Sequence, residues 1–127
     1  MATSRRVQPA PAPEHLAVPE GAPRCDEALA RAFRFLGKRW SGMVLGTLMS
    51  GPASFSDIRR ALGGVSDSVL SERLTELAQA GLVLREVDAG PPVAVRYRLT
   101  PAGQALMPAL RELMTWARTH LPADRCG

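Results

Sequence analysis

Apolar residues along this chain recur mostly at the spacing of amphipathic helices. Leu29, Phe33 and Leu36 stand at positions i, i+4 and i+7, so they share one face of a helix over residues 26–36. The same kind of spacing predicts a second helix over residues 40–49. The chain therefore opens its regular structure with two consecutive helices.

Two further helices follow, and a pair of glycines at positions 63–64 separates them. The first covers residues 55–62 with Ser54 as its N-cap, and the second covers residues 66–80 with Ser66 as its N-cap. A short helix, a glycine turn and a second helix together predict a helix-turn-helix. The apolar positions that indicate these two helices are Phe55, Ile58, Leu62, Leu70, Leu74 and Leu77.

The hydrophobic pattern changes from helical to alternating over residues 82–99. Between residues 93 and 99 apolar side chains occupy every second position, which is typical of a strand with one buried face. Residues 82–87 are aliphatic enough to pair with that strand across a proline-containing loop. The expected fold class is therefore mainly α (α+β), a winged helix-turn-helix with a two-stranded β-wing.

A last helix is predicted over residues 100–120, with Thr100 as its N-cap and Pro101 in the first helical position. Its apolar residues cover two adjacent faces, so this helix needs its own core and a second partner. A two-fold related copy of the chain is the default partner. The alternative is that Met107 and Met114 fill one broad core.

Composition and charge narrow the classes of protein that remain. The chain has 127 residues, a net charge of +4 and no apolar run long enough to span a membrane. Residues 1–22 are rich in proline and alanine and carry no net charge, which predicts a disordered N-terminal tail. The single domain expected over residues 23–127 therefore carries the whole positive excess, and nucleic acid is one partner that fits it.

The residues that enzymes and metal sites require are scarce. Cys25 and Cys126 form no CxxC pair, and neither His15 nor His120 has an obvious partner for nucleophilic catalysis. We therefore expect no enzyme, no metal site and no cofactor.

A winged helix-turn-helix predicts which side chains meet DNA. Its second helix enters the major groove with its N-terminal end, where short polar side chains fit. We expect Ser66, Ser68, Ser71 and Arg73 to contact DNA from this helix, Arg59 and Arg60 from the end of the preceding helix, and Arg96 and Arg98 from one face of the wing. For each arginine a solvated surface position is the alternative, and Arg73 has a further one, an ion pair with Glu76.

An ordered series of short motifs runs from Cys25 to Trp116. The motifs are Gly37-Lys38-Arg39-Trp40, Phe55-Ser56-Asp57-Ile58, Ser71-Glu72-Arg73-Leu74-Thr75-Glu76-Leu77, Gly81-Leu82-Val83, Pro91-Pro92-Val93 and Tyr97-Arg98-Leu99-Thr100-Pro101-Ala102-Gly103. This series resembles the HxlR-type winged helix-turn-helix regulators of bacteria. The resemblance implies a cytoplasmic transcription factor that binds a palindromic DNA operator as a homodimer, joined through its first and last helices. It also implies that Trp40 lies in the core and that Lys38 or Arg39 approaches the DNA backbone.

The same resemblance implies that Cys25, just before the first helix, senses oxidants or electrophiles. Arg24 and the helix N-terminus favour the thiolate, while Asp26 opposes it. The alternative is a cysteine that is simply packed, and Cys126 is a possible second thiol.

Two other functions stay open on the sequence alone. One is a winged-helix module that contacts another protein and reads no DNA. The other is a regulator that responds to a small molecule held in an apolar crevice near Phe33, Trp40 and Trp116, at the dimer interface. Nothing in the sequence identifies the effector or the operator.

Overall fold

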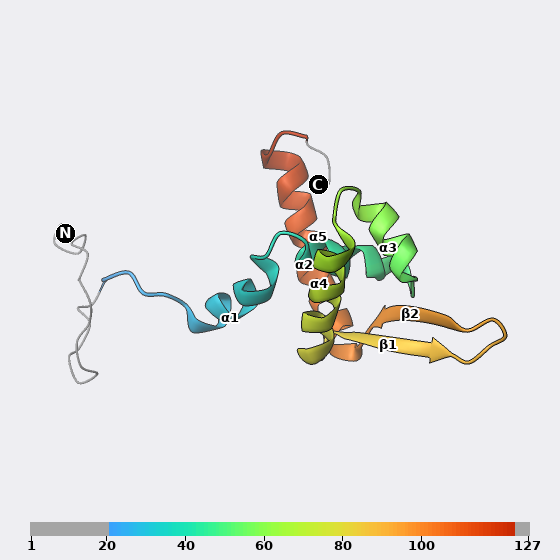
Figure 1. Ribbon diagram of the computed structural model, residues 1–127. Coiled ribbons are helices and arrows are strands. Elements are labelled where there is room, and N and C mark those ends of the chain that lie inside the picture. The colour runs from blue at the N-terminus through green and yellow to red at the C-terminus, as the bar shows by residue number, and fades with distance from the viewer. Residues whose placement is uncertain (1–20, 124–127) are drawn as a thin grey trace. The chain divides into compact units, whose positions relative to one another are not determined.

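The computed structural model describes residues 21–123, and its elements follow the predicted order (Figure 1). Five α-helices and one hairpin are described, so the predicted fold class is confirmed. The second helix is shorter than expected, since a 3₁₀ turn replaces its last residues. The elements are α1 (Glu27–Leu36), α2 (Ser41–Thr47), η2 (Leu48–Ser50), α3 (Phe55–Leu62), α4 (Asp67–Gln79), β1 (Val83–Asp88), β2 (Ala94–Leu99) and α5 (Pro101–His120).

Two predictions fall wholly or mostly on residues outside the described range. The predicted tail, residues 1–22, lies outside it except for its last two residues, and Cys126 lies outside it altogether. No helix within residues 21–123 is long and apolar enough to cross a membrane.

Three predicted N-caps are present as side-chain hydrogen bonds. The hydroxyl of Ser54 accepts from the amide of Asp57 at 3.1 Å, and the hydroxyl of Ser66 accepts from the amide of Val69 at 3.2 Å. Thr100 caps α5 in the same way, through the amide of Gly103. Each cap satisfies an otherwise unpaired amide and is typically worth about 1 kcal/mol, so these residues set where the helices begin.

The chain divides into two units, and the boundary falls inside α1, between Ala32 and Phe33. No residue of α1 is buried. Two residues of the predicted stripe are exposed, Leu29 at 58% and Phe33 at 53% of full exposure, whereas Leu36 is partly buried against the core. Leu29 and Phe33 of α1 are therefore outside the core.

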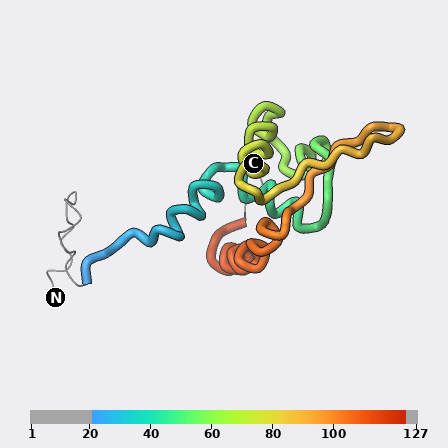
Figure 2. Tube along the Cα trace, turned by 90° about the horizontal axis from the view of Figure 1, so that it is seen from below, coloured from blue at the N-terminus to red at the C-terminus, as the bar shows by residue number. Residues whose placement is uncertain are grey.

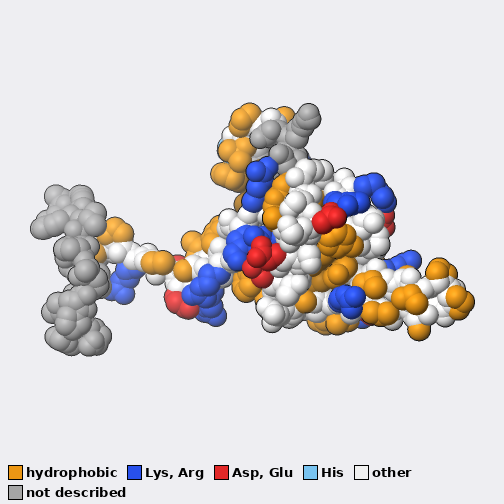
Figure 3. Space-filling model, viewed as in Figure 1, with side chains coloured by type: hydrophobic (Ala, Val, Ile, Leu, Met, Phe, Trp, Pro, Cys, Tyr) orange, Lys and Arg blue, Asp and Glu red, His pale blue; other side chains and the backbone are white. Residues whose placement is uncertain are grey.

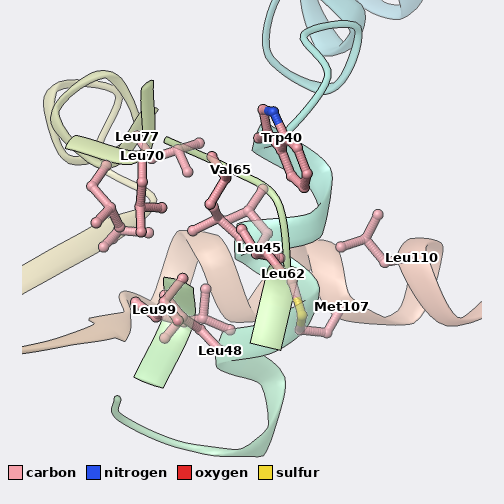
Figure 4. Packing of buried hydrophobic residues seen from close by; sticks show 14 residues of the cluster. Trp40, Leu45, Leu48, Leu62, Val65, Leu70, Leu77, Leu99, Met107 and Leu110 are labelled. Carbon is pink, nitrogen blue, oxygen red and sulfur yellow. The ribbon is translucent and has the colours of Figure 1, made fainter. Parts of the chain in front are cut away.

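The hydrophobic core belongs to the second unit and is built around α2 (Figure 4). Val44 and Leu45 of this helix are completely buried, and α2 contacts α3, α4 and α5. Trp40 is also buried, as the resemblance implied. The other core residues are Leu48, Ile58, Leu62, Val65, Leu70, Leu74, Leu77, Val83, Leu99, Met107 and Leu110.

The hairpin projects from the helices as a wing, with only its base in the core (Figures 1 and 2). Its strands are antiparallel, from the pair Val83 and Leu99 at the base to the pair Asp88 and Ala94. Ala53 forms an isolated antiparallel β-bridge with Tyr97, because its amide and carbonyl exchange hydrogen bonds of 3.0 and 2.8 Å with that residue. This bridge fixes the base of the wing against the segment that precedes α3.

A close approach of two backbones positions α5. The hydroxyl of Thr100 donates to the carbonyl of Gly81 at 2.6 Å, and the amide of Thr100 donates to the carbonyl of Leu82 at 3.0 Å. A Cβ atom added at Gly103 would lie 2.2 Å from the carbonyl oxygen of Leu82. Only glycine fits this contact, which explains why the Thr-Pro-Ala-Gly motif ends in glycine.

Candidate nucleic-acid interface

Helix α4 presents a polar face to solvent, and the turn before it sets its direction. Gly63 and Gly64 have φ of +61° and +98°, a region that glycine adopts without steric cost. The N-terminal end of α4 then exposes the hydroxyls of Ser66 and Ser68, which lie 3.4 Å apart, and the next turn exposes Ser71. The three predicted serines therefore lie together at one exposed end of this helix.

The two arginines at the end of α3 are exposed, and each pairs with a carboxylate. Arg59 bonds Asp67, at the start of α4, at 2.8 Å. Arg60 pairs with Asp57 on its own helix. The Arg59 pair spans the glycine turn, so it also ties the two helices of the helix-turn-helix together. Exposed pairs of this kind contribute at most about 1 kcal/mol.

Glu76 on α4 links two of the predicted cations. Its carboxylate accepts from Lys38 at 3.1 Å and from Arg73 at 2.8 Å, so it joins α4 to the segment before α2. The hydrogen bond from Lys38, helped by Arg73, holds the pKa of Glu76 below its ordinary value, although partial burial opposes this. Arg73 thus lies in the ion pair that the sequence left as its alternative role.

The surroundings of Arg73 and Arg39 complete this part of the surface. The Arg73 side chain is only 17% exposed, also lies 3.4 Å from Glu72, and has a buried Nε with no partner among the described residues. The Arg39 guanidinium lies 4.9 Å from the centre of the Trp40 ring, a cation–π distance. Arg39 therefore covers the outer side of the buried tryptophan.

Arg96 and Arg98 share one face of the wing, as the alternation predicted, and Glu86 lies on that face with them. Glu86 is directly opposite Arg96 in the strand register and bonds Arg98 at 2.9 Å. Within residues 21–123 Arg96 itself makes no ion pair. One carboxylate therefore lies between the two predicted wing arginines.

The structure adds an arginine that the sequence analysis did not select. Arg85 lies on the other face of the wing, directly opposite Tyr97. Together with residues of α4 it lines a shallow groove of about 570 Å³ between that helix and the wing. The two-residue period of a strand places Arg85 on the same face as Val83 and Val87. Which face turns toward α4, however, depends on how the hairpin packs.

Exposed apolar side chains gather on α5 as well as on α1. Leu113 and Trp116 are half exposed, and the Trp116 ring lies 6.1 Å from that of His120. An apolar groove of about 550 Å³ lies between α2 and α5 and includes Phe33. The predicted crevice differs in detail, because Trp40 belongs to the core and Trp116 does not line this groove. Cys25 is exposed and carries a free thiol.

A helix-turn-helix followed directly by a hairpin wing defines a winged-helix DNA-binding protein. The family model described as HxlR-like helix-turn-helix matches residues 35–125. The chain belongs to this family, as the motif series predicted. It is a DNA-binding transcriptional regulator and not an enzyme.

Relatives in sequence and structure agree with this assignment. YodB of Bacillus subtilis, an HTH-type transcriptional regulator, is 43% identical over 86 residues, which are 68% of this chain and 77% of YodB. The structure of reduced YodB matches 80% of this chain and 100% of its own, with a TM-score of 0.70 and 38% identity. The redox regulator HypR in its oxidised form matches 76% of this chain and 99% of its own, with a TM-score of 0.71 and 26% identity. YodB has also been solved after diamide treatment and with bound quinone.

Proposed function

We propose that this regulator binds a palindromic DNA operator as a homodimer, with α4 of each protomer in the major groove. The observation that carries the proposal is the exposed N-terminal end of α4, where Ser66, Ser68 and Ser71 present short hydroxyl side chains. Such side chains let a helix approach base edges closely and hydrogen-bond to them. Two copies related by a two-fold axis would meet two half-sites in the same way.

The cations around α4 supply the contacts to the DNA backbone. Arg59, Arg60 and Arg98 are ion-paired in the free protein, but a guanidinium has five N–H donors and a carboxylate occupies at most two of them. The remaining donors can bond a phosphate without breaking the pair. The residues proposed to contact DNA are Lys38, Arg39, Arg59, Arg60, Ser66, Ser68, Ser71, Arg73, Arg96 and Arg98.

The homodimer is supported by the apolar surface that α1 and α5 leave exposed. Leu29, Phe33, Leu113 and Trp116 are each half exposed or more, although they lie on helices with regular apolar stripes. Large apolar side chains left exposed on a helix mark an interaction surface. We therefore assign the dimer interface to the first and last helices.

A salt titration of DNA binding tests the proposal. The wild-type protein should protect a short palindrome in the DNA upstream of its own gene. Its affinity should fall with salt at a log–log slope of roughly 0.9 for each neutralised phosphate. Ser68→Ala should weaken operator binding more than binding to a scrambled duplex, because a base contact carries sequence information. Equal, weak binding of wild type to every duplex would instead favour the protein-contact module.

We further propose that modification of the Cys25 thiol switches operator binding. The side chain is exposed, and the similar regulators have been solved in different redox states: YodB reduced and diamide-treated, HypR oxidised and reduced. Modification at a dimer seam would change the separation of the two α4 helices and so their fit to two half-sites. Diamide or a quinone should change the operator affinity of wild type and leave Cys25→Ser unaffected. Identical responses of the two proteins would exclude the switch.

The apolar groove beside α2 favours regulation of the protein by a small-molecule ligand. It is lined by Phe33, Met43, Leu113 and Met114 among others, and its volume of about 550 Å³ suits a small ligand. An aromatic compound that enters it should raise the thermal unfolding midpoint of wild type. Met43→Glu should abolish that shift, and a shift unchanged in this variant would place the compound elsewhere.

A further inference from the structure

Two grooves flank the wing, one on each face, and their charges are opposite. The groove beside α4 contains Arg85 and has no carboxylate in its lining. The groove on the other face contains Arg96 together with Glu86 and Asp88. The side chains of the first therefore sum to +1 and those of the second to −1. A polyanion is attracted to the first groove and gains little from the second.

The cation of the groove beside α4 stands on the anchored part of the wing backbone. Arg85 stands directly opposite Tyr97, the residue that two backbone hydrogen bonds tie to Ala53. Arg96 lies one position further toward the loop of the hairpin. Because the anchored base of the wing fixes the backbone of Arg85, little backbone entropy is lost when a ligand binds, and only the side chain has to be ordered.

Hydrogen-bond donors line the helix side of the same groove. Ser71 and Gln79 are exposed there, and neither side chain donates to another described residue. Thr75 lies between them, but its hydroxyl already donates to the carbonyl of Ser71 at 2.9 Å. The groove thus offers one guanidinium, one hydroxyl and one amide to an anion. Figure 3 shows basic side chains on the side of the wing in view.

We propose that this groove seats a phosphate backbone of the DNA duplex, with Arg85 as its principal cation. The inference rests on the proposed position of α4 in the major groove, and it places the wing over the adjacent minor groove. One sugar-phosphate backbone separates a major groove from the adjacent minor groove, so a helix in the first and a wing over the second must straddle it. The groove between α4 and β1 lies where that backbone passes.

This assignment reverses the order of importance that the sequence suggests for the wing. The groove of Arg96 contains the carboxylates of Glu86 and Asp88, whereas the groove of Arg85 contains no carboxylate. Arg85 therefore contributes more to DNA affinity than Arg96 does. Because phosphates carry no base identity, its contribution is equal on any sequence.

The test compares Arg85→Ala with Arg96→Ala in the full-length protein, by salt titration on the operator duplex and on a scrambled duplex. The two variants lose the same charge from opposite faces of one hairpin. Arg85→Ala should lower affinity roughly tenfold on both duplexes and reduce the salt slope by about 0.9, while Arg85→Lys retains most of the affinity. Arg96→Ala should have a smaller effect, and the thermal unfolding midpoint of each variant checks its fold.

Three results would overturn the assignment. If wild type binds the operator and Arg85→Ala binds it equally well with the same salt slope, the groove is not a phosphate seat. If Arg96→Ala loses more affinity than Arg85→Ala, the other face of the wing meets the backbone. If wild type binds no duplex in a salt-dependent manner, the proposed function fails first and this inference fails with it.

Discussion

Gly103 illustrates how a missing side chain positions a whole helix. It lies in the first turn of α5, where the backbone of Leu82 passes so closely that a Cβ atom would overlap its carbonyl oxygen. Gly46 in α2 offers a contrast, because a Cβ atom there would meet nothing within 4 Å. Close packing therefore requires glycine at position 103, whereas position 46 has room for a side chain.

Gly103→Ala should destabilise the protein by about 1–3 kcal/mol, because the backbone at Leu82 must move to admit the methyl group. Gly46→Ala should be neutral or stabilising by up to about 1 kcal/mol, because alanine favours the helix. Urea unfolding of the two variants at equal protein concentration measures both effects. Equal stability of the two variants would show that α5 can shift away from Leu82 at no cost.

Helix α4 is held at both ends by contacts of different kinds. At its start the Ser66 cap and the Arg59–Asp67 pair connect it to the glycine turn. Near its end Glu76 connects it to Lys38. The orientation of the proposed DNA-reading helix therefore depends on two neighbouring elements, α3 and the segment that leads from α1 into α2.

Glu76→Gln should make the stability of the protein less sensitive to acid. The pKa of Glu76 is lowered in the folded state, chiefly by the hydrogen bond from Lys38, so the unfolded chain takes up a proton more readily. The stabilisation is complete above the unfolded pKa, near pH 4, and is lost as the pH falls through the lower folded pKa. Thermal unfolding midpoints measured across this range should fall more steeply for wild type than for Glu76→Gln.

Glu112→Gln on α5 is the matched control, because Glu112 is exposed and makes no ion pair within residues 21–123. Its unfolding midpoints should follow those of wild type. Parallel curves for wild type and Glu76→Gln would mean that the link between α4 and Lys38 contributes nothing measurable.

The molecule as a whole divides its apolar residues between two uses. The core of the second unit consumes those of α2, α3 and α4, whereas α1 and the second half of α5 keep theirs exposed. A monomer with this apolar surface exposed to water would tend to aggregate. The proposed homodimer therefore accounts for the distribution that neither helix explains alone.

Leu113→Glu should shift the protein toward monomers, because it places a charge among the exposed apolar residues of α5. Sedimentation equilibrium should show a dimer dissociation constant raised at least about tenfold, and operator affinity should fall since two half-sites are no longer bound together. Leu84→Glu is the control for the dimer dissociation constant alone, because Leu84 is an exposed leucine on the wing. A dimer unchanged in Leu113→Glu would place the interface elsewhere.

The pattern of residues along the chain was sufficient to predict the order of helices and strands. The apolar stripe of Leu70, Leu74 and Leu77, the alternation before Thr100 and the Ser66 cap are all readable because each depends on residues a few positions apart. The exposed serines of α4 follow from the same periodicity. The family, too, was evident from the spacing of its motifs.

Contacts between distant parts of the chain could not be predicted in this way. Glu76 meets Lys38 across 38 positions, and a single residue, Ala53, joins the sheet through Tyr97 without any periodic signal. The face of the wing that turns toward α4, and with it the place of Arg85, likewise follows from packing. The local pattern thus specified the elements and most of the candidate DNA contacts. Their mutual orientation, and which cations already have a carboxylate beside them, emerged from the folded structure because these depend on where separate elements meet in space.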